Sequence, residues 1–364
     1  MALRCGIVGL PNVGKSTIFN ALTAAGVAAE NYPFCTIEPN SGVVPVPDPR
    51  LEAVNEIVRA TRAVPASVEF IDIAGLVKGA SQGEGLGNKF LAHVRETHAL
   101  VHVIRCFEHP NVAHVEGELD PVRDAETVAT ELALADLDAV ERRLERVRRA
   151  AKAGGVEERE EFAFLESLLA HISAGAPAAA FAVPEPCRAA FGALHLLTAK
   201  PVLYVANVAE AELAEPGEQA RALEAYAEHG ATPILRLCGK VEAELAELDA
   251  ESRRLFLAEL GLPEPGLHRL IRAAYELLGL ITFFSATQKE VRAWTVRRGT
   301  LAPQAAGEIH SDFERHFVGA DVASFEEFVA AGGEAAARAD GTLRLEGRDY
   351  AVRDGDVIHF RAAV

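Results

Sequence analysis

Residues 9–17 read GLPNVGKST, and this stretch decides the fold. Gly9 is followed after four residues by Gly14, Lys15 and Ser16, which matches the P-loop pattern G-x-x-x-x-G-K-[ST] at every position. In a P-loop, glycines let backbone N–H groups surround phosphates, the lysine adds a compact positive charge, and the hydroxyl holds magnesium. The stretch therefore predicts a site for a nucleotide with Mg²⁺.

The residues on both sides of the loop predict the strand and the helix between which a P-loop lies. Residues 3–8, LRCGIV, form a short and mostly apolar run of strand length. Residues 15–25 place Ile18, Phe19 and Leu22 on one helical face. Strand and helix segments then alternate to about residue 107, as a parallel sheet with crossover helices requires. We therefore expect an α/β fold, a P-loop NTPase G-domain with a mostly parallel sheet.

The composition changes twice after this α/β pattern. Residues 124–171 place apolar side chains at helical intervals, and Gly154-Gly155 divides them into two helical stretches. Strand-like runs resume at Pro201, a helix is expected over 267–280, and short alternating runs separated by turns follow from Ile281. We expect a G-domain over 1–123 and 200–280, a helical insertion over 124–199, and a strand-rich C-terminal domain over 281–364.

The chain has 364 residues, of which 49% are hydrophobic and 24% charged, the composition of an ordinary globular protein. No run approaches the ~20 apolar residues that span a bilayer, and no secretory signal precedes the first strand. Five cysteines without a CxxC pair argue against a disulfide framework and a zinc site. We expect a cytoplasmic protein, a monomer, without membrane contact.

The net charge of −17 disfavours indiscriminate binding to nucleic acid, because like charges repel over the whole surface. Any RNA contact must therefore be a local basic patch. The candidate is ERRLERVRRAAK, residues 141–152, where arginines and a lysine outnumber two glutamates. A solvated helix face with ion pairs four residues apart is an equally good interpretation.

Further motifs complete a magnesium and phosphate site. Residues 70–75, FIDIAG, read as an apolar strand ending in D-x-x-G. In P-loop enzymes the aspartate, here Asp72, helps to hold the magnesium shell, and the glycine N–H, here Gly75, senses the terminal phosphate. Thr36, in the loop NYPFCTIEP, supplies a second hydroxyl to magnesium when that loop closes.

The residue after this glycine is Leu76, where many GTPases carry the glutamine that positions the attacking water. A leucine cannot form a hydrogen bond with water, so the polar group must come from elsewhere. His114 and Asn12 are the candidates, and Asn12 could also present its carbonyl oxygen to K⁺ beside the phosphates.

The nucleobase is read directly after the strand PVLYVA, at Asn207-Val208-Ala209-Glu210. Guanine-specific proteins usually carry N-K-x-D here, and the short carboxylate accepts two N–H groups from guanine. Val208 replaces the lysine and Glu210 the aspartate, while the Asn207 amide can accept from the adenine N6 group. ATP becomes at least as good a candidate as GTP.

Taken together, these motifs resemble the Obg-like ATPase family, the YchF group, over essentially the whole length. The shared stretches are GLPNVGKST, NYPFCTIEPN, DIAGLVKGASQGEGLGNKF, NVAE and EVRAWTVRRGTLAPQAAGEIHSDFERHF. The resemblance implies a G-domain with a coiled-coil-like helical insertion, a C-terminal β-grasp TGS domain, ATP preference and association with the ribosome.

Carried over by residue, the resemblance also assigns the site. Its phosphate contacts fall on Asn12, Val13, Gly14, Lys15, Ser16 and Thr17, its magnesium ligands on Ser16 and Thr36, its adenine contacts on Asn207 and Val208, and its catalytic histidine on His114. Cys238-Gly239-Lys240 departs from the S-A-K-like triplet of relatives, so the loop that lines the base is left unassigned.

The expected function is ATP hydrolysis coupled to ribosome binding. A GTPase of the same fold is the nearest alternative. A nucleotide-sensing ribosome-binding module with incidental hydrolysis is the alternative from another class, and Leu76 favours it because slow turnover is expected.

Overall fold

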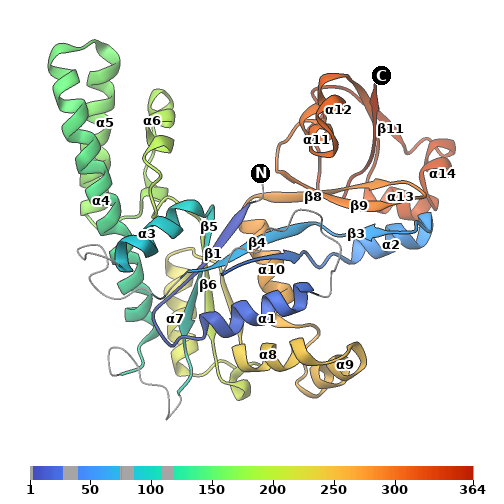
Figure 1. The fold of residues 1–364 in the computed structure, drawn as a ribbon, viewed down its shortest axis with the longest axis horizontal. Coiled ribbons are helices and arrows are strands. Elements are labelled where there is room, and N and C mark those ends of the chain that lie inside the picture. Colours follow the sequence, from blue (N-terminus) through green and yellow to red (C-terminus); the bar gives the residue numbers. More distant parts are fainter. Residues whose placement is uncertain (1–2, 28–39, 74, 76–85, 109–117, 364) are drawn as a thin grey trace. The chain divides into compact units, whose positions relative to one another are not determined.

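A computed structural model describes residues 3–27, 40–73, 75, 86–108 and 118–363 (Figure 1). The chain divides into two compact units. The first comprises Met1–Gly42 with Glu69–Arg269, and the second comprises Val43–Val68 with Leu270–Val364. The domain boundaries expected from the sequence remain predictions.

A six-stranded sheet carries the P-loop. Its strand order is β2-β4-β1-β5-β6-β7, and β1 pairs in parallel with both β4 and β5. The β5 strand is buried at every residue, as a central strand covered on both faces requires. The α/β fold class is therefore confirmed. The strands are β1 Arg4–Val8, β2 Ser41–Pro45, β4 Ser67–Asp72, β5 Ala99–Arg105, β6 Val202–Asn207 and β7 Ile234–Leu237.

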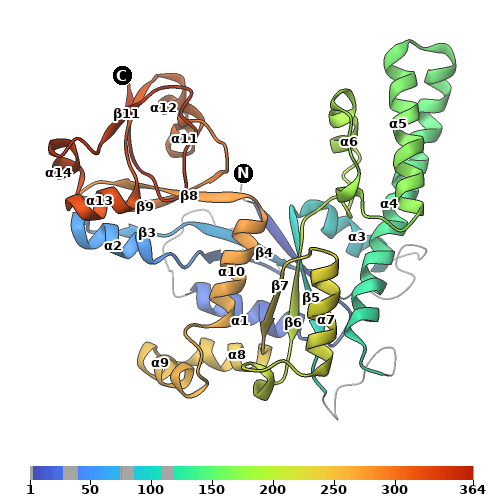
Figure 2. The ribbon, with the colours of Figure 1, turned by 180° about the vertical axis from the view of Figure 1, so that it is seen from behind.

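Helices surround this sheet (Figures 1 and 2). The helix after the P-loop, α1, packs on β1 and on α8, whereas α7 packs on β6 and β7. This placement leaves the carboxyl ends of β1, β4 and β6 at one edge, where ligands bind in open α/β sheets. The helices of the first unit include α1 Lys15–Val27, α3 Leu86–Glu96, α7 Glu218–His229, α8 Gly239–Glu247, α9 Ala250–Glu259 and the short 3-10 turn η3 Glu210–Glu212. The short helix α6 Arg188–Ala193 and the 3-10 turns η1 Ala178–Ala180 and η2 Glu185–Cys187 pack with the helical insertion, and α10 Gly266–Leu277 runs from the first unit into the second.

The insertion is a helical hairpin formed by α4, Pro121–Ala153, and α5, Val156–Ser173, which lie side by side in Figure 1. The expected break at Gly154-Gly155 is confirmed. The first helix begins at Pro121 rather than at residue 124, because Asp120 caps it and accepts a hydrogen bond from the Arg123 N–H at 3.0 Å. The hairpin has its own apolar core, which includes Val140, Val147, Phe164, Leu165 and Leu168.

The second unit contains another six-stranded sheet, in the order β11-β10-β12-β8-β9-β3. The hairpin β8–β9 is antiparallel, β12 lies parallel to β8, and β10 pairs antiparallel with β12. This is the strand arrangement of a β-grasp domain, as predicted. The elements are α2 Pro49–Val58, β3 Ala63–Val64, β8 Leu280–Ala286, β9 Val291–Arg297, α11 Ala302–Ile309, α12 Ser311–Arg315, β10 Phe317–Ala323, α13 Phe325–Ala331, α14 Glu334–Ala339, β11 Arg344–Glu346 and β12 Val357–Ala362.

Residues 43–68 pack with the β-grasp sheet. The β3 strand pairs in parallel with β9, and α2 packs against α13, β8 and β9. The Arg50 guanidinium forms an ion pair with Asp354 at 2.8 Å and lies over the Phe284 ring. Two segments that are far apart in the sequence therefore share one core.

The helix expected over 267–280 ends earlier, at Leu277. Gly279 adopts φ +66°, the left-handed conformation that glycine allows after a helix, and β8 begins at Leu280. The predicted end was therefore wrong, because an apolar pattern alone does not separate the last helical turn from a buried strand.

In the described part of the chain, no helix is both long and apolar enough to cross a membrane. The cysteines described there, Cys5, Cys106, Cys187 and Cys238, are buried free thiols.

Candidate nucleotide-binding site

The P-loop connects β1 to α1 as the sequence predicts. Three of its residues have positive φ angles: Gly9 at +150°, Asn12 at +63° and Gly14 at +97°. A Cβ atom at Gly9 would lie 2.3 Å from the Val103 carbonyl oxygen, so only glycine fits where the loop passes β5. The Ile18 N–H donates to the Gly14 carbonyl at 3.0 Å and starts the helix. The loop therefore curls at the positive end of α1, where anions bind.

Lys15 is folded back into this loop. Its Nζ donates to the Leu10 carbonyl oxygen at 2.7 Å, and the residue is only 7% exposed. Burial lowers the pKa of Lys15 to about 8, while the negative charge of Asp72 acts in the opposite direction. A phosphate group beside the ammonium would restore its charged form, so the site is electrostatically matched to an anion.

The predicted magnesium residues Ser16 and Asp72 are adjacent. The Ser16 hydroxyl donates to Asp72 Oδ2 at 2.9 Å. The other carboxylate oxygen, Asp72 Oδ1, is buried and has no hydrogen-bond partner among the described residues. A hydroxyl next to a carboxylate with a free buried oxygen is a donor set that fits a hard cation such as Mg²⁺.

Gly75 follows β4 and lies next to the P-loop. A Cβ atom at this position would lie 3.1 Å from Lys15 Nζ and 3.3 Å from the Pro11 nitrogen. Its backbone is therefore close to the P-loop lysine, as the D-x-x-G interpretation expects. Thr36, Leu76 and His114, which the sequence assigned to magnesium binding and water activation, lie outside the described residues.

Asn207 ties the base side of the site to the P-loop. Its Nδ2 donates to the Val13 carbonyl oxygen, and its Oδ1 accepts from the Gly239 N–H, both at 2.9 Å. A Cβ atom at Gly14 would lie 2.3 Å from Asn207 Nδ2, so the loop and the amide touch. Asn207 is 4% exposed and acts as a buried strut between the P-loop and the start of α8.

The other two residues assigned to the base occupy different environments. The Val208 side chain is 1% exposed and belongs to an apolar cluster that includes Ala125, Leu223 and Val241. Glu210 is exposed at the first position of η3. Of the remaining assigned residues, Asn12, Ser16 and Thr17 are exposed and Val13 is buried.

Gly239 is a site residue that the sequence analysis left unassigned. It lies two residues after the end of β7 and contacts Asn207 through its backbone N–H. Its position at the carboxyl end of the strand next to β6 was the signal that could have identified it, because ligands gather at such ends.

Comparisons with known proteins give consistent results. Residues 280–363 match the YchF-GTPase_C family, described as "Protein of unknown function (DUF933)", and residues 4–136 match the MMR_HSR1 family, described as "50S ribosome-binding GTPase". The chain is 52% identical over 360 residues to "Ribosome-binding ATPase YchF" of Escherichia coli O157:H7 and 51% identical over 363 residues to the protein of that name from Bacillus subtilis (strain 168). Each of these two matches covers 99% of both chains.

Among solved structures, the chain is similar to the Schizosaccharomyces pombe YchF GTPase. The TM-score is 0.90 at 36% sequence identity, and the match covers 99% of this chain and 97% of the other. The sequence matches and the structural match therefore both extend over the two compact units.

Proposed function

The chain belongs to the YchF family, and from this premise we propose that it is an ATP-hydrolysing P-loop protein that binds the ribosome in a nucleotide-dependent manner. The observation that carries the proposal is the convergence of Lys15, the Ser16–Asp72 pair and the Asn207 strut on one loop. The bacterial relatives over the full length are named ribosome-binding ATPases, which supports the activity and the partner.

Phosphate binding falls to the loop itself. The N–H groups of residues 12–17 and the positive end of α1 would surround the β-phosphate, and Lys15 would exchange the Leu10 carbonyl for a phosphate oxygen. Gly75, next to Lys15, would contact the terminal phosphate through its N–H. These groups bind and orient the triphosphate for attack in line.

Proteins with the P-loop fold generally use Mg²⁺. Ser16 and Asp72 would hold the ion, with Thr36 as a further ligand. Bound there, the ion would neutralise the charge that develops on the phosphate oxygens. K⁺ at Asn12 is the finer part of this proposal, because Asn12 is exposed in the P-loop and its side chain contains a carbonyl oxygen.

The residues at the expected base-binding position, Val208 and Glu210, favour ATP. The position of the guanine-binding lysine is occupied by Val208, whose side chain is buried in an apolar cluster. Glu210 is exposed, and its longer side chain replaces the short carboxylate that reads guanine. Since the Asn207 amide is engaged at both ends, we assign its role to positioning the loop beside the base. A GTPase is the second candidate, and the description of the S. pombe relative as a GTPase favours it.

Water activation falls to His114 or to Asn12, because Leu76 has no polar group. We expect slow basal hydrolysis, because a hydrogen-bonding side chain at the position of Leu76 normally orients the attacking water.

Ribosome contact is assigned to the arginine-rich part of α4. Arg142 pairs with Asp138 on the same helix, and Arg143 pairs with Glu161 of α5. Arg146, Arg148 and Arg149 are exposed and form no ion pair within the described part of the chain. These three arginines carry the uncompensated charge that rRNA phosphates would neutralise. A ribosomal partner would place the protein in the cytoplasm.

The experiment combines hydrolysis and co-sedimentation. ATP and GTP turnover would be measured with and without ribosomes, in potassium and in sodium. We expect faster ATP hydrolysis with ribosomes and with potassium. Pelleting with ribosomes should differ between ADP and a non-hydrolysable ATP analogue, and Arg146→Glu with Arg149→Glu should weaken it, whereas Arg221→Glu on α7 should not.

Each alternative has its own outcome. Ribosome affinity that depends on nucleotide without any turnover would favour a sensing module. Tighter binding and faster turnover of GTP would favour the GTPase. Identical pelleting in every nucleotide state, or none, would refute the ribosome-binding switch.

A further inference from the structure

Asn40 has a backbone conformation that few residues other than glycine adopt. Its φ angle is +73°, and it lies exposed in a turn directly before β2. Asparagine tolerates this left-handed region, whereas residues with a branched Cβ are rare there. Unusual backbone conformations of this kind gather where the surrounding structure needs them, often near functional sites. The contacts of the turn show what this one holds.

The turn holds the backbone of Asp72, the carboxylate that pairs with Ser16. The Asp72 N–H donates to the Asn40 carbonyl oxygen at 2.8 Å. On the other side of β4, the Ile73 N–H donates to the Ile7 carbonyl oxygen at 3.1 Å, and Ile7 belongs to β1, which leads to the P-loop. The end of β4 is therefore fixed between the Asn40 turn and the strand before the P-loop.

The bond at Asn40 lies in register with the rest of the β2–β4 pair. The two strands are neighbours in the sheet, and the Val46 N–H donates to the Ala66 carbonyl oxygen at 2.8 Å near their other ends. Asn40 and Val46 are as far apart in the chain as Ala66 and Asp72, so the strands run in opposite directions without a slip between the two bonds.

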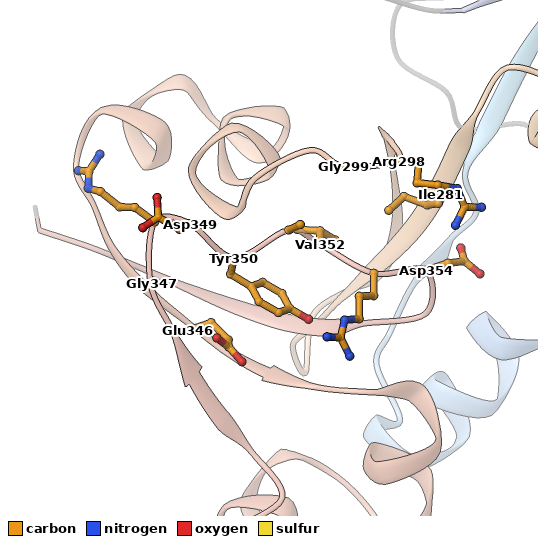
Figure 3. Close-up of a pocket in the computed structure, with 12 residues that line it drawn as sticks. Ile281, Arg298, Gly299, Glu346, Gly347, Asp349, Tyr350, Val352 and Asp354 are labelled. Carbon is orange, nitrogen blue, oxygen red and sulfur yellow. The ribbon is translucent and has the colours of Figure 1, made fainter.

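The segment between β2 and β4 is held at its far end within the β-grasp unit. The α2 helix packs on β8 and β9, and Arg50 forms an ion pair with Asp354 at 2.8 Å. Figure 3 shows Asp354 at one end of a cavity of about 750 Å³, whose lining has three carboxylates and three arginines and therefore balanced charge. Because α2 is anchored there, a slip of β2 along β4 would disrupt this packing.

The start of β2 also lies close to the P-loop helix. A Cβ atom at Gly42 would lie 2.3 Å from Thr23 Cγ2 of α1, so the backbone of β2 passes α1 at a distance that glycine allows. Gly42 is two residues from Asn40. With β2 restrained by α1 and by its register with β4, the conformation of Asn40 determines where its carbonyl points.

The magnesium site of the proposed function needs the Asp72 carboxylate in one place. Its Oδ2 accepts from the Ser16 hydroxyl at 2.9 Å, and its buried Oδ1 has no hydrogen-bond partner among the described residues. A shift of the Asp72 backbone would move both oxygens. We propose that Asn40 is a positioning residue for this site, because its left-handed turn directs the carbonyl that holds the Asp72 N–H. The inference rests on the magnesium assignment of the proposed function.

A substitution at Asn40 changes the cost of the left-handed conformation and keeps the backbone carbonyl. Valine disfavours positive φ angles, so a valine variant relieves the strain by releasing the turn. Metal binding must then restore the turn, which reduces the apparent affinity for the metal. Glycine adopts positive φ angles readily, so a glycine variant should keep the site although it lacks the amide side chain.

The test measures Mn²⁺ binding to the full chain by electron paramagnetic resonance, a readout that does not depend on hydrolysis. ADP is present at less than one equivalent and at concentrations well above its Kd, so that little free ADP competes for the metal. We expect Asn40→Val to weaken Mn²⁺ binding about fivefold or more and Asn40→Gly to stay within about twofold of the unmutated protein. Asn40→Ala should lie between them, and it replaces the valine variant if that protein does not fold.

The matched control is Ala231→Val. Ala231 is exposed, has φ +49° and lies in the turn between α7 and β7, at the amino end of a strand whose carboxyl end faces the site. This variant places the same side chain in the same backbone region of the first unit. Urea unfolding should show lower stability in both valine variants, whereas Mn²⁺ affinity should fall in Asn40→Val alone.

Unchanged Mn²⁺ affinity in Asn40→Val would overturn the inference, as would an equal loss in Asn40→Gly or in Ala231→Val. Ser16→Ala separates this result from the proposed function. Weaker Mn²⁺ binding in Ser16→Ala but not in Asn40→Val refutes the positioning role alone. Unchanged binding in Ser16→Ala, or no Mn²⁺ binding by the unmutated protein, refutes the magnesium assignment and the inference with it.

Discussion

Asn207→Ala is the sharpest test of how the site is assembled, because one side chain joins two loops that are distant in sequence. The substitution removes the donor to the Val13 carbonyl and the acceptor for the Gly239 N–H, each at 2.9 Å. The amide is 4% exposed, so both backbone groups would lose their partner in a buried place. Each such loss costs about 1–3 kcal/mol, and the pair should lower the free energy of unfolding by about 2–6 kcal/mol.

The loss should also appear in nucleotide affinity. Without the strut, the P-loop can leave the arrangement that binds phosphate, and each 1.4 kcal/mol of that cost weakens binding about tenfold. Urea unfolding followed by far-ultraviolet circular dichroism and ATP titration by calorimetry measure the two effects.

Two further variants test whether the hydrogen bonds of the Asn207 amide cause these effects. Asn207→Asp keeps an oxygen for the Gly239 N–H but turns a second oxygen toward the Val13 carbonyl, so it should lose at least half of the stability that the alanine variant loses. Asn20→Ala, an exposed asparagine on α1, is the control and should change neither quantity. Wild-type stability and ATP affinity in Asn207→Ala would show that the strut has no role in shaping the loop.

Three more predictions concern the same site. Because burial lowers the pKa of Lys15 to about 8, whereas the unfolded value is near 10.5, the unfolded chain binds more protons between these values, and the nucleotide-free protein should gain stability as pH rises from 8 to 10.5. ATP binding at pH 8.5 should be accompanied by uptake of a proton, which appears as a calorimetric enthalpy that depends on the buffer. Lys15→Met should abolish the proton uptake, the dependence of stability on pH and hydrolysis. Persistence of these effects in the variant would contradict the role of the lysine. Ser16→Ala should raise the magnesium concentration needed for half-maximal activity at least tenfold, whereas Thr17→Ala should raise it less, and equal responses in the two variants would contradict the Ser16–Asp72 assignment. Val208→Lys with Glu210→Asp should shift the ratio of ATP to GTP affinity toward GTP; an unmutated protein that binds GTP ten times more tightly than ATP would refute the argument from the base.

The local part of the fold could be predicted from the sequence because short-range patterns determine it. The glycine spacing of residues 9–17 produces the loop, and the apolar run of residues 99–105 becomes the fully buried β5 strand. The break between the insertion helices follows from Gly154-Gly155, since neither glycine favours continuing a helix. In each case the deciding residues are neighbours in the chain.

Long-range packing could not be predicted in the same way. The packing of α2 and β3 with β8, β9 and α13 depends on contacts such as Arg50 with Asp354, and nothing within residues 43–68 indicates the partner. The bridge from Asn207 to Gly239 is similar, because a turn that follows a strand does not reveal which side chain its N–H will meet. Sequence motifs identified the side chains that the structure brings together in the candidate site. They did not identify the Gly239 N–H, because a single backbone group has no sequence motif of its own.

A nucleotide can change the affinity for a partner only if ATP and ADP contact two conformations differently. The difference between them is the terminal phosphate, and Gly75 lies beside Lys15, which we propose contacts that phosphate. The next described element along the chain is α3, whose carboxyl end is held by Lys200 through the carbonyl oxygens of Arg95 and Thr97. Lys200 lies two residues after Thr198, and Asp136 of α4 accepts hydrogen bonds from the Thr198 N–H and hydroxyl. A displacement of α3 would therefore stretch these hydrogen bonds, which connect through residues 198–200 to α4, the helix that carries the arginines. These hydrogen bonds connect the carboxyl end of α3 to α4 within the first compact unit.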